Sequence, residues 1–216
     1  SHSPLIHNRA MQHAGVNARY LPFRVPPDDL NTFIAACPKI GIHGISITIP
    51  HKERALDYCT QAEASATGIG AINTMIFDEN DRLGYNTDYR AAMDCINAVY
   101  SNSDAAVSHQ GRRVLILGAG GVSRAIAWGL KQRGADATIA RRSYDRAAAM
   151  AHELGTRVVT WDDRHAQKPQ LLVNGTPVGM HPNVDEAPYS KTAINNFMVV
   201  FDTVYNPENT LLIKQA

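Results

Sequence analysis

Residues 114–125 read VLILGAGGVSRA, an apolar run that leads through a glycine-rich turn into a helical pattern. The four apolar residues are typical of a strand that is buried on both faces of a parallel sheet. Glycines allow a tight turn and a close backbone approach to a pyrophosphate, which the N–H groups at the start of the next helix attract. The turn residues Gly118, Gly120, Gly121 and Val122 are therefore candidate cofactor-binding residues. A glycine turn without a ligand is the alternative reading.

The residues after this turn complete a strand–helix–strand unit. Ile126 and Leu130 recur at the spacing of one helical face, and Gly134 is a natural helix end. The run ATIA at 137–140 predicts a second strand, at the distance expected for a parallel pair that is joined by a helix. Further strands of the same sheet are predicted at 157–159, 171–173 and 198–201.

Arginines stand at the end of the second strand, where many dinucleotide sites carry a carboxylate. Sites for NAD usually place Asp or Glu there to bind the ribose 2′-hydroxyl. This chain instead has Arg141, Arg142 and Ser143, followed by Arg146. Guanidinium groups bind a 2′-phosphate with charge-assisted, often bidentate hydrogen bonds, so the sequence predicts a preference for NADP. A solvated basic helix start is the alternative, which is weakened because cations at a helix N-terminus oppose the helix dipole.

The N-terminal half predicts a second α/β lobe. Alternating apolar residues predict a strand at 45–49 that ends at Pro50 and leads into a helix over 52–56. Two further runs, at 71–77 and 82–86, flank a polar turn and predict a hairpin.

A helix that Thr87 opens follows the hairpin. Its apolar positions include Met93, Ile96 and Val99. The polar stretch 100–111 then reads as a linker. We therefore predict a two-lobed α/β fold, with an N-terminal α/β substrate lobe over 1–100 and a Rossmann-like dinucleotide-binding domain with a parallel sheet over 101–216.

Lys52 and Asp88 are the candidate catalytic residues. Lys52 is predicted just past a strand end, in the opening turn of a helix, where a cation is unfavourable; strand ends are also where open α/β proteins bind ligands. Asp88 is predicted at the start of another helix, where its charge is stabilised and it can pair with Lys52. The alternatives are a surface lysine that Glu53 offsets and ordinary helix capping by Thr87 and Asp88.

Three more polar residues are candidate substrate contacts. Asn73 carries a donor and an acceptor, which suits recognition of a polyol, and a turn-side Asn is the equally common alternative. Ser1 and Ser3 flank His2 and precede Pro4, so their hydroxyls can bind a carboxylate from a loop before a helix. Plain N-capping is the alternative for the serines.

The composition describes an ordinary globular protein and argues against several classes. Of 216 residues, 44% are hydrophobic and 19% charged, and the formal net charge of +1 argues against nucleic acid as the main partner. No apolar run reaches the length of a membrane span, and no secretory signal is visible. The nine histidines lack metal-ligand spacing, and Cys37, Cys59 and Cys95 form no CxxC pair. We expect no metal, reduced thiols and a cytoplasmic location.

Taken together, these segments resemble the shikimate dehydrogenase family. The matching motifs occur in the family's order and cover essentially the whole chain. In the N-terminal half they are SHSPLIHN (1–8), GISITIPHK (44–52), GAINT (70–74) and GYNTD (84–88). In the C-terminal half they are GAGGVSRA (118–125), Arg142-Ser143, NGTPVGM (174–180) and DTVYNP (202–207).

The resemblance implies an NADP-dependent, reversible reduction of 3-dehydroshikimate to shikimate, in the pathway to aromatic amino acids. It implies that Lys52 is the catalytic lysine and Asp88 its partner, and that both face the ring hydroxyls of the substrate together with Asn73. The implied substrate contacts are Ser1, Ser3, Thr48, Asn73 and Tyr205, of which the serines and the tyrosine face the carboxylate.

The resemblance also implies which residues hold the cofactor. Arg142, Ser143 and Arg146 resemble the family's clamp for the 2′-phosphate. Thr176 and Met180 are further implied cofactor contacts, with Met180 in a loop near the nicotinamide.

Two departures from the family pattern concern Arg141 and the ends of the chain. Arg141 stands where the family usually has Asn, which either strengthens or distorts the clamp. The family's first strand, and its terminal segment with a substrate-binding glutamine and return helices, have no counterpart between Ser1 and Ala216. Two rival readings stay open, a dual quinate/shikimate dehydrogenase and a non-catalytic NADP-binding regulatory module. A monomer or homodimer is expected.

Overall fold

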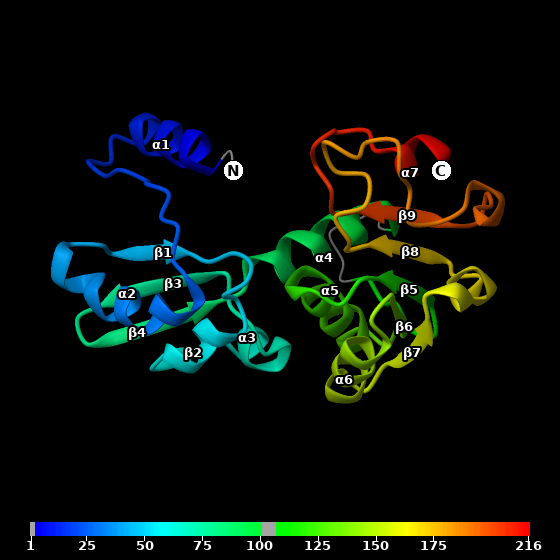
Figure 1. Cartoon of the computed structure of the whole chain (residues 1–216), viewed down its shortest axis with the longest axis horizontal. Helices are drawn as coiled ribbons and strands as arrows, with labels where there is room; N and C mark the ends of the chain where they lie inside the picture. The colour runs from blue at the N-terminus through cyan, green and yellow to red at the C-terminus, as the bar shows by residue number, and fades with distance from the viewer. Residues whose placement is uncertain (1–2, 101–106) are drawn as a thin grey trace. The chain divides into compact units, whose positions relative to one another are not determined.

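The structure is a computed structural model that describes residues 3–100 and 107–216, whose helices and strands appear in Figure 1. The chain separates into two compact units, Ser1–Gly41 and Ile42–Ala216. The predicted substrate contact Ser1 lies outside the described residues. The predicted lobe boundary near residue 100 stays a prediction.

The first unit consists of short helices and an extended stretch between them. Its elements are α1 (Ser3–His13), η1 (Pro27–Asp29), α2 (Leu30–Ala36) and η2 (Pro38–Ile40), where η marks a 3₁₀ helix. The Asn8 side chain joins α1 to the following stretch, because it donates to Tyr20 O at 3.0 Å and accepts from Tyr20 N–H at 2.8 Å. The sequence predicted that Ser3 lies on a loop before a helix. This is wrong, because Ser3 lies in the first turn of α1.

The second unit begins with a four-stranded sheet in the order β1-β3-β4-β2. The strands are β1 (Gly44–Ser46), β2 (Gln61–Ala62), β3 (Thr74–Asp78) and β4 (Asp81–Tyr85). The predicted hairpin is confirmed, because β3 and β4 are antiparallel neighbours. The helical segments of this part are η3 (Arg54–Tyr58), α3 (Ala64–Ile69) and α4 (Thr87–Tyr100). In α4, Met93 and Ile96 are buried as expected, whereas Val99 is exposed.

The strand predicted at 45–49 is wrong in its second half. Pairing with β3 reaches as far as the Ile47 N–H, which donates to Asn73 O at 2.7 Å. Beyond that point the chain leaves the sheet, and Ile49 is exposed. Alternating apolar residues therefore continued past the end of the strand, because a hydrophobic pattern does not mark where a pairing partner stops.

The helix predicted over 52–56 is also wrong. Residues 49–53 form turns and a bend, and the only regular segment that follows them before β2 is the 3₁₀ helix η3. Lys52 therefore precedes a 3₁₀ helix and does not occupy the first turn of an α-helix. The dipole argument for Lys52 does not apply, because a short 3₁₀ segment has no sustained macrodipole.

The rest of the second unit is a five-stranded sheet in the order β7-β6-β5-β8-β9, with all neighbours parallel. The strands are β5 (Arg113–Leu117), β6 (Asp136–Arg141), β7 (Arg157–Thr160), β8 (Leu171–Asn174) and β9 (Val199–Asp202). The helical segments are α5 (Gly121–Gln132), α6 (Tyr144–Leu154), η4 (Asp162–Gln167), η5 (Lys191–Ala193) and α7 (Leu211–Gln215). This strand order is that of a Rossmann domain, in which successive strands are added on one side of β5 and then, from β8 on, on its other side. The predicted α/β fold class is confirmed.

Strand β5 is apolar throughout because both faces of the sheet are covered. Val114 and Ile116 join a core with α4, α5 and α6, and Figure 1 shows α5 and α6 on that side of the sheet. Leu115 and Leu117 face the other way, into a core that Tyr189 closes together with residues of β8 and α7. Successive strand residues point to opposite faces, so a doubly covered strand cannot show a polar alternation.

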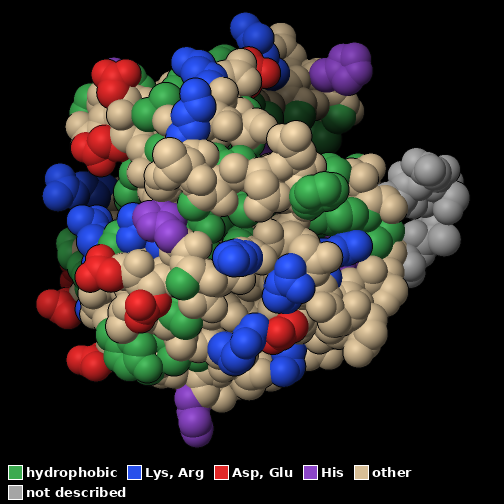
Figure 2. Space-filling view, turned by 90° about the vertical axis from the view of Figure 1, so that its right-hand side faces the viewer, with side chains coloured by type: hydrophobic (Ala, Val, Ile, Leu, Met, Phe, Trp, Pro, Cys, Tyr) green, Lys and Arg blue, Asp and Glu red, His purple; other side chains and the backbone are tan. Residues whose placement is uncertain are grey.

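None of the helices within 3–100 and 107–216 has the length and the apolar content that a membrane span requires. On the face drawn in Figure 2, Lys and Arg side chains lie among Asp and Glu side chains, so no single sign of charge dominates that face.

Candidate active site

Lys52 and Asp88 form an ion pair, although 36 positions separate them in the chain. Lys52 Nζ lies 2.5 Å from Asp88 Oδ2, and the side chains are 13% and 26% exposed. Asn73 Nδ2 donates to the other carboxylate oxygen of Asp88 at 2.9 Å. The structure therefore brings three of the predicted site residues into one hydrogen-bonded cluster, which we call the Lys52 cluster.

Asp88 is available to this cluster because another residue caps its helix. Asn86 Oδ1 accepts the Tyr89 N–H at 3.3 Å, which is the bond that an N-cap side chain makes. Asn86 is itself buried and donates to Ala71 O at 2.9 Å. The alternative reading, in which Thr87 and Asp88 cap the helix, is therefore wrong, and both carboxylate oxygens of Asp88 point to Lys52 and Asn73.

Asn73 is held by the start of α4 as well. Its Oδ1 accepts the Thr87 N–H at 3.0 Å, and its Nδ2 donates to Thr87 Oγ1 at 2.9 Å. Thr74 Oγ1 also donates to Asn73 Oδ1, at 3.0 Å. The amide orientation is thus fixed from several sides, with the nitrogen toward Asp88.

Lys52 also lies against the glycine-rich turn. Its backbone O accepts the Ile72 N–H at 2.9 Å, which ties it to the segment that leads to Asn73. A Cβ added at Gly121 would lie 3.1 Å from Lys52 Cδ, so the lysine stem packs on the first residue of α5. The Lys52 cluster and the turn therefore belong to one site.

The turn itself fits a pyrophosphate. Gly118 has φ +104°, and a Cβ there would lie 2.9 Å from Gly175 O, so only glycine fits. At Gly120 an added Cβ would meet nothing within 4 Å, which leaves open space over the turn. The first N–H groups of α5, a helix of 12 residues, have no acceptor within the helix. Open space beside such donors is the arrangement that binds phosphate groups.

The turn after β8 is locked to the turn after β5. Ser123 Oγ donates to Gly175 O at 3.3 Å, and a Cβ at Gly175 would lie 2.1 Å from that hydroxyl. The Gly175 N–H donates to Leu117 O at 2.8 Å. The contact lies between β5 and β8, where the strand order of the sheet reverses, which is where open α/β sheets bind their ligands.

The predicted clamp residues lie at the end of β6, the strand next to β5 in the sheet. Arg141 ends β6, Ser143 is the N-cap position of α6, and Arg146 lies in the first turn of α6. Arg142, Ser143 and Arg146 are exposed. In the described part of the chain Arg142 and Arg146 form no ion pair, so their charges are open to an anionic ligand. These residues fit a 2′-phosphate by their charge and by the kind of donor that they carry.

The remaining predicted site residues are spread over separate loops. Thr176 follows β8 and donates from Oγ1 to Asn174 Oδ1 at 2.6 Å, while Met180 and Tyr205 are exposed. Thr48 is exposed beside the Lys52 turn, where its O accepts the His51 N–H at 2.9 Å. Within the described residues, no hydrogen bond joins these four side chains to the Lys52 cluster.

Sequence reasoning missed the residues that support the site. Asn86 caps α4, and the bond between Ser123 and Gly175 joins the turn after β5 to the turn after β8. Arg124 Nη1 donates to Ile69 O at 3.2 Å and pairs with Glu153 at 2.5 Å. Asn86 was open to prediction, because Asn directly before a helical pattern is a strong N-cap signal. The partners of Ser123 and Arg124 are 52 and 55 positions away, which no local pattern reveals.

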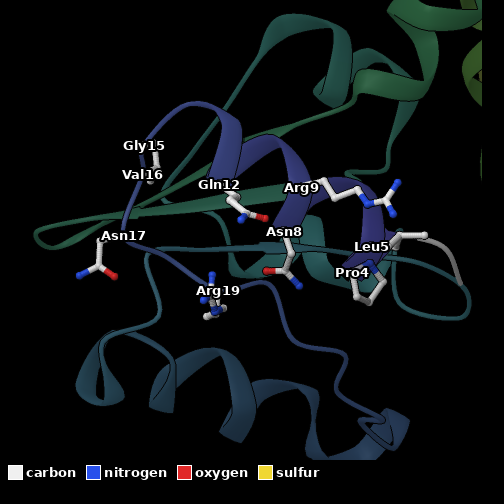
Figure 3. Close-up of a pocket in the computed structure, with 9 residues that line it drawn as sticks. All are labelled: Pro4, Leu5, Asn8, Arg9, Gln12, Gly15, Val16, Asn17 and Arg19. Atoms are coloured by element: carbon white, nitrogen blue, oxygen red, sulfur yellow. The ribbon is translucent and has the colours of Figure 1, made fainter.

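Two hollows of the surface contain little of this site. One, of about 640 Å³, lies over α1 in the first unit and contains none of the predicted site residues (Figure 3). The other, of about 700 Å³, lies between the four-stranded sheet and α4 and includes Thr74 and Thr87, the neighbours of Asn73. Neither hollow contains Lys52 or Asp88.

Two family models match the chain. A model described as shikimate dehydrogenase substrate binding domain matches residues 1–75. A second, described as saccharopine dehydrogenase NADP binding domain, matches residues 114–214. The second match covers the five-stranded sheet and the glycine-rich turn.

Named relatives match over almost the full chain. A shikimate dehydrogenase (NADP(+)) of Methanothermobacter thermautotrophicus is 36% identical over 224 residues, which are 99% of this chain and 77% of that protein. The chloroplastic bifunctional 3-dehydroquinate dehydratase/shikimate dehydrogenase of Arabidopsis thaliana is 37% identical, and this chain spans only 38% of its length. The crystal structure of a Thermus thermophilus shikimate 5-dehydrogenase with NADP(H) and shikimate is 29% identical, with a TM-score of 0.85 over 100% of this chain and 78% of that one.

Proposed function

The chain belongs to the shikimate dehydrogenase family, and from this premise we propose that it catalyses the NADP-dependent, reversible reduction of 3-dehydroshikimate to shikimate. One observation carries the proposal beyond the likeness. The ammonium of Lys52 lies 2.5 Å from Asp88, and its stem packs on Gly121 of the phosphate-binding turn. A proton donor thus stands beside the place that is built to bind a dinucleotide.

In this proposal Lys52 is the general acid. Its Nζ carries the proton that the C3 oxygen receives on reduction and takes that proton back in the oxidation of shikimate. Asp88 fixes the ammonium through Oδ2, and Asn73 fixes Asp88 through Oδ1. The lone pairs that these bonds leave on the carboxylate are acceptors for a ring hydroxyl of the substrate. Bound NADPH supplies the hydride that the carbonyl carbon receives.

The residues that would hold this cofactor lie along one edge of the five-stranded sheet. Gly118, Gly120, Gly121 and Val122 would face the pyrophosphate through the backbone. Arg141, Arg142, Ser143 and Arg146 would hold the 2′-phosphate, and Thr176 and Met180 the nicotinamide end. The open space at Gly120 and the uncompensated charge of Arg142 and Arg146 support these roles.

The proposed substrate contacts are Ser1, Ser3, Thr48, Asn73 and Tyr205. Asn73 has the best support, because its amide is already bonded to Asp88 at 2.9 Å. Thr48 and Tyr205 are exposed, and each can reach a ligand without breaking a buried contact. We propose a small-molecule substrate, no nucleic-acid partner and a monomer or homodimer. We also propose a cytoplasmic location, which the free thiols Cys37, Cys59 and Cys95 support, because thiols stay reduced in that compartment.

A spectrophotometric assay tests the function directly. The chain is mixed with shikimate or quinate and with NADP or NAD, and formation of the reduced cofactor is followed. We expect the highest kcat/KM with shikimate and NADP. Equal rates with quinate would indicate the dual-specificity enzyme. Binding of NADPH without oxidation by 3-dehydroshikimate would indicate a non-catalytic regulatory module.

A further inference from the structure

A buried polar network joins the ends of β8 and β9. Asn174 and Asp202 are opposite each other in the strand register, and Asn174 Nδ2 donates to Asp202 Oδ1 at 2.9 Å. Asn174 and Thr210 are both 0% exposed. Burial of polar groups costs free energy unless their hydrogen bonds are made, and apolar residues of similar size would avoid that cost. The network therefore needs a reason beyond filling space.

Asn174 fixes the beginning of the loop that follows β8. Its Oδ1 accepts the Thr176 N–H at 3.0 Å and Thr176 Oγ1 at 2.6 Å. Its Nδ2 donates to Val178 O at 3.3 Å in addition to Asp202. Both amide protons and both oxygen lone pairs are used, which leaves one orientation for the side chain. A single buried amide is thus bonded to the loop at both Thr176 and Val178.

Asp202 fixes the loop that follows β9 in the same way. Its Oδ1 also accepts the Val204 N–H at 2.9 Å, next to Tyr205. Its Oδ2 accepts from Thr210 Oγ1 at 2.7 Å. Thr210 Oγ1 in turn accepts the Ile213 N–H at 3.3 Å and so caps α7. The carboxylate connects the loops after both strands to the helix that follows them.

Most bonds of this network end on loop backbones, while the side chains of Met180 and Tyr205 remain exposed. Met180 is 42% and Tyr205 69% exposed. Both loops leave the carboxyl edge of a parallel sheet, which is the edge where such sheets bind ligands. Held backbones with accessible side chains are what a preorganised binding site needs, because ordering cost is then met on folding and not on binding.

We propose that Asn174, Asp202 and Thr210 are positioning residues for the reduction. They hold the loops of Met180 and Tyr205 so that the nicotinamide end of the cofactor and the substrate carboxylate bind in one arrangement. This inference rests on the proposed function and adds residues that act on both ligands through the loops they hold.

Thr210→Val tests the proposal, because it keeps the shape of the side chain and removes the hydroxyl. We expect kcat to fall about ten-fold or more and KM for shikimate to rise, since small misplacements at a reacting centre cost large factors in rate. The preference for NADP over NAD should not change, because Arg142 and Arg146 follow β6 and not β8 or β9. Thr210→Ser restores the hydroxyl and should restore both constants.

Thr60→Val is the matched control. Thr60 Oγ1 donates to Asp81 at 2.9 Å and accepts the Arg82 N–H at 2.8 Å, so it makes the same two bonds as Thr210 at an exposed place of the other sheet. We expect kcat and KM of this variant to equal those of the wild type. Wild-type constants in a folded Thr210→Val would overturn the proposal, whatever its melting temperature.

NADPH fluorescence gives a reading that does not need turnover. Thr210→Val should bind NADPH with an unchanged Kd, and the bound nicotinamide should lose part of the emission change that the wild type produces. If the wild type turns over no shikimate, the proposed function fails, and the emission comparison still decides whether the network positions the nicotinamide. No emission change in the wild type, or the same change in both, would overturn the proposal. If Thr210→Val does not fold, Thr210→Ala gives the same readings, because it also removes the hydroxyl that donates to Asp202.

Discussion

Asp88 is the residue on which the Lys52 cluster converges. Its two oxygens bind different partners, Lys52 from the segment after β1 and Asn73 from the start of the hairpin. Each partner is a stronger donor to a carboxylate than to a neutral acceptor, so the arrangement orients Asp88 as firmly as it orients Lys52. Removal of the lysine therefore affects the chemistry first and the geometry second.

Lys52→Ala should lower kcat by about 10² to 10⁴, the range that a lost general acid costs, with a modest change in KM for shikimate. The assay is steady-state oxidation of shikimate with saturating NADP. Lys39→Ala, which removes an exposed lysine of the first unit, is the control for loss of a positive charge. Near-normal turnover of Lys52→Ala would end the assignment.

His109 is a second residue whose surroundings have a measurable consequence. It is fully buried, its Nε2 lies 2.9 Å from Asn97 Oδ1, and its Nδ1 is bonded to the Arg112 guanidinium. Because a guanidinium can only donate, Nδ1 is the acceptor and Nε2 carries the proton. Burial, and then the charges of Arg112 and Arg133, lower the pKa of His109 to about 4.

This pKa predicts that stability falls on acidification. An unfolded His titrates near 6.5. Between about pH 6.5 and pH 4, His109 therefore binds a proton in the unfolded chain and not in the folded chain. The stabilisation is therefore complete above pH 6.5 and is lost as the pH falls toward 4, by about 3 kcal/mol at most. Urea unfolding at pH 7 and pH 4.5 measures it. In His109→Gln the loss of stability between the two pH values should be smaller by about 2–3 kcal/mol, whereas in His152→Gln, at an exposed position, it should be unchanged.

At the scale of elements, α5 connects the two sheets. It begins at Gly121, the last glycine of the glycine-rich turn, and its buried face packs on the five-stranded sheet. Its residues Trp128 and Ala125 pack on α3 and Tyr89. The Tyr89 and Trp128 rings meet edge to face at 5.0 Å. Small residues are needed where helices approach this closely.

Gly129→Ala tests the closeness of α4 and α5. Alanine favours a helix by about 1 kcal/mol over glycine, so on propensity alone the variant should be more stable. An added Cβ would lie 2.5 Å from the Tyr89 ring and 2.9 Å from Met93 Sδ, so we expect a net loss of about 1–3 kcal/mol through overpacking. Urea unfolding measures it, with Gln132→Ala at an exposed position of α5 as the control. A higher free energy of unfolding for Gly129→Ala would mean that the Tyr89 and Met93 side chains move away from the added Cβ at little cost.

The sequence predicted the elements with one clear period and misplaced those without one. The apolar run before Gly118 predicted β5, and the spacing of Ile126 and Leu130 predicted α5. Both predictions succeeded because each pattern is typical of only one kind of element. Around Pro50 the pattern failed, because Ile47 and Ile49 alternate like a strand although β1 ends at Ser46. Tertiary pairing, and not local propensity, decided that boundary.

The candidate site was predictable only in part, for a related reason. Residue chemistry and helix starts drew attention to Lys52 and Asp88, and the structure joins them. The bond from Asn86 to Ala71 O and the pairing of Asn174 with Asp202 depend on partners 15 and 28 positions away, which no local pattern reveals. The separate ligand contacts at Thr48, Met180 and Tyr205 stay predictions.

At the scale of the molecule, cofactor binding is linked to stability. A ligand that binds only the folded chain stabilises it by about 2.7 kcal/mol at a hundred times its Kd. For a chain of this size each kcal/mol raises Tm by about 2–4 °C. Tm is therefore a direct reading of the residues that hold NADP, independent of turnover.

NADP should raise Tm by about 5–10 °C at such a concentration, and NAD at the same concentration by less. In the double variant Arg142→Ala with Arg146→Ala the difference between the two shifts should shrink, because two of the three guanidinium groups proposed to hold the 2′-phosphate are gone. Differential scanning fluorimetry measures it. Arg157→Ala, which breaks an exposed ion pair with Asp136 at the start of β7, is the control and should keep the wild-type difference. An unchanged difference in the double variant would remove these arginines from the clamp.

The tight contact between Gly175 and Ser123 has a consequence for engineering. A side chain at Gly118 would displace the turn after β8, and one at Gly175 would displace Ser123. Substitutions at these two positions should therefore be poorly tolerated. Met180 and Tyr205 differ from these glycines, because their side chains are exposed on loops whose backbones are held by hydrogen bonds. A mutagenesis library should therefore randomise Met180 and Tyr205 and leave Gly118 and Gly175 unchanged, since exposed side chains on held backbones can vary without disturbing the fold.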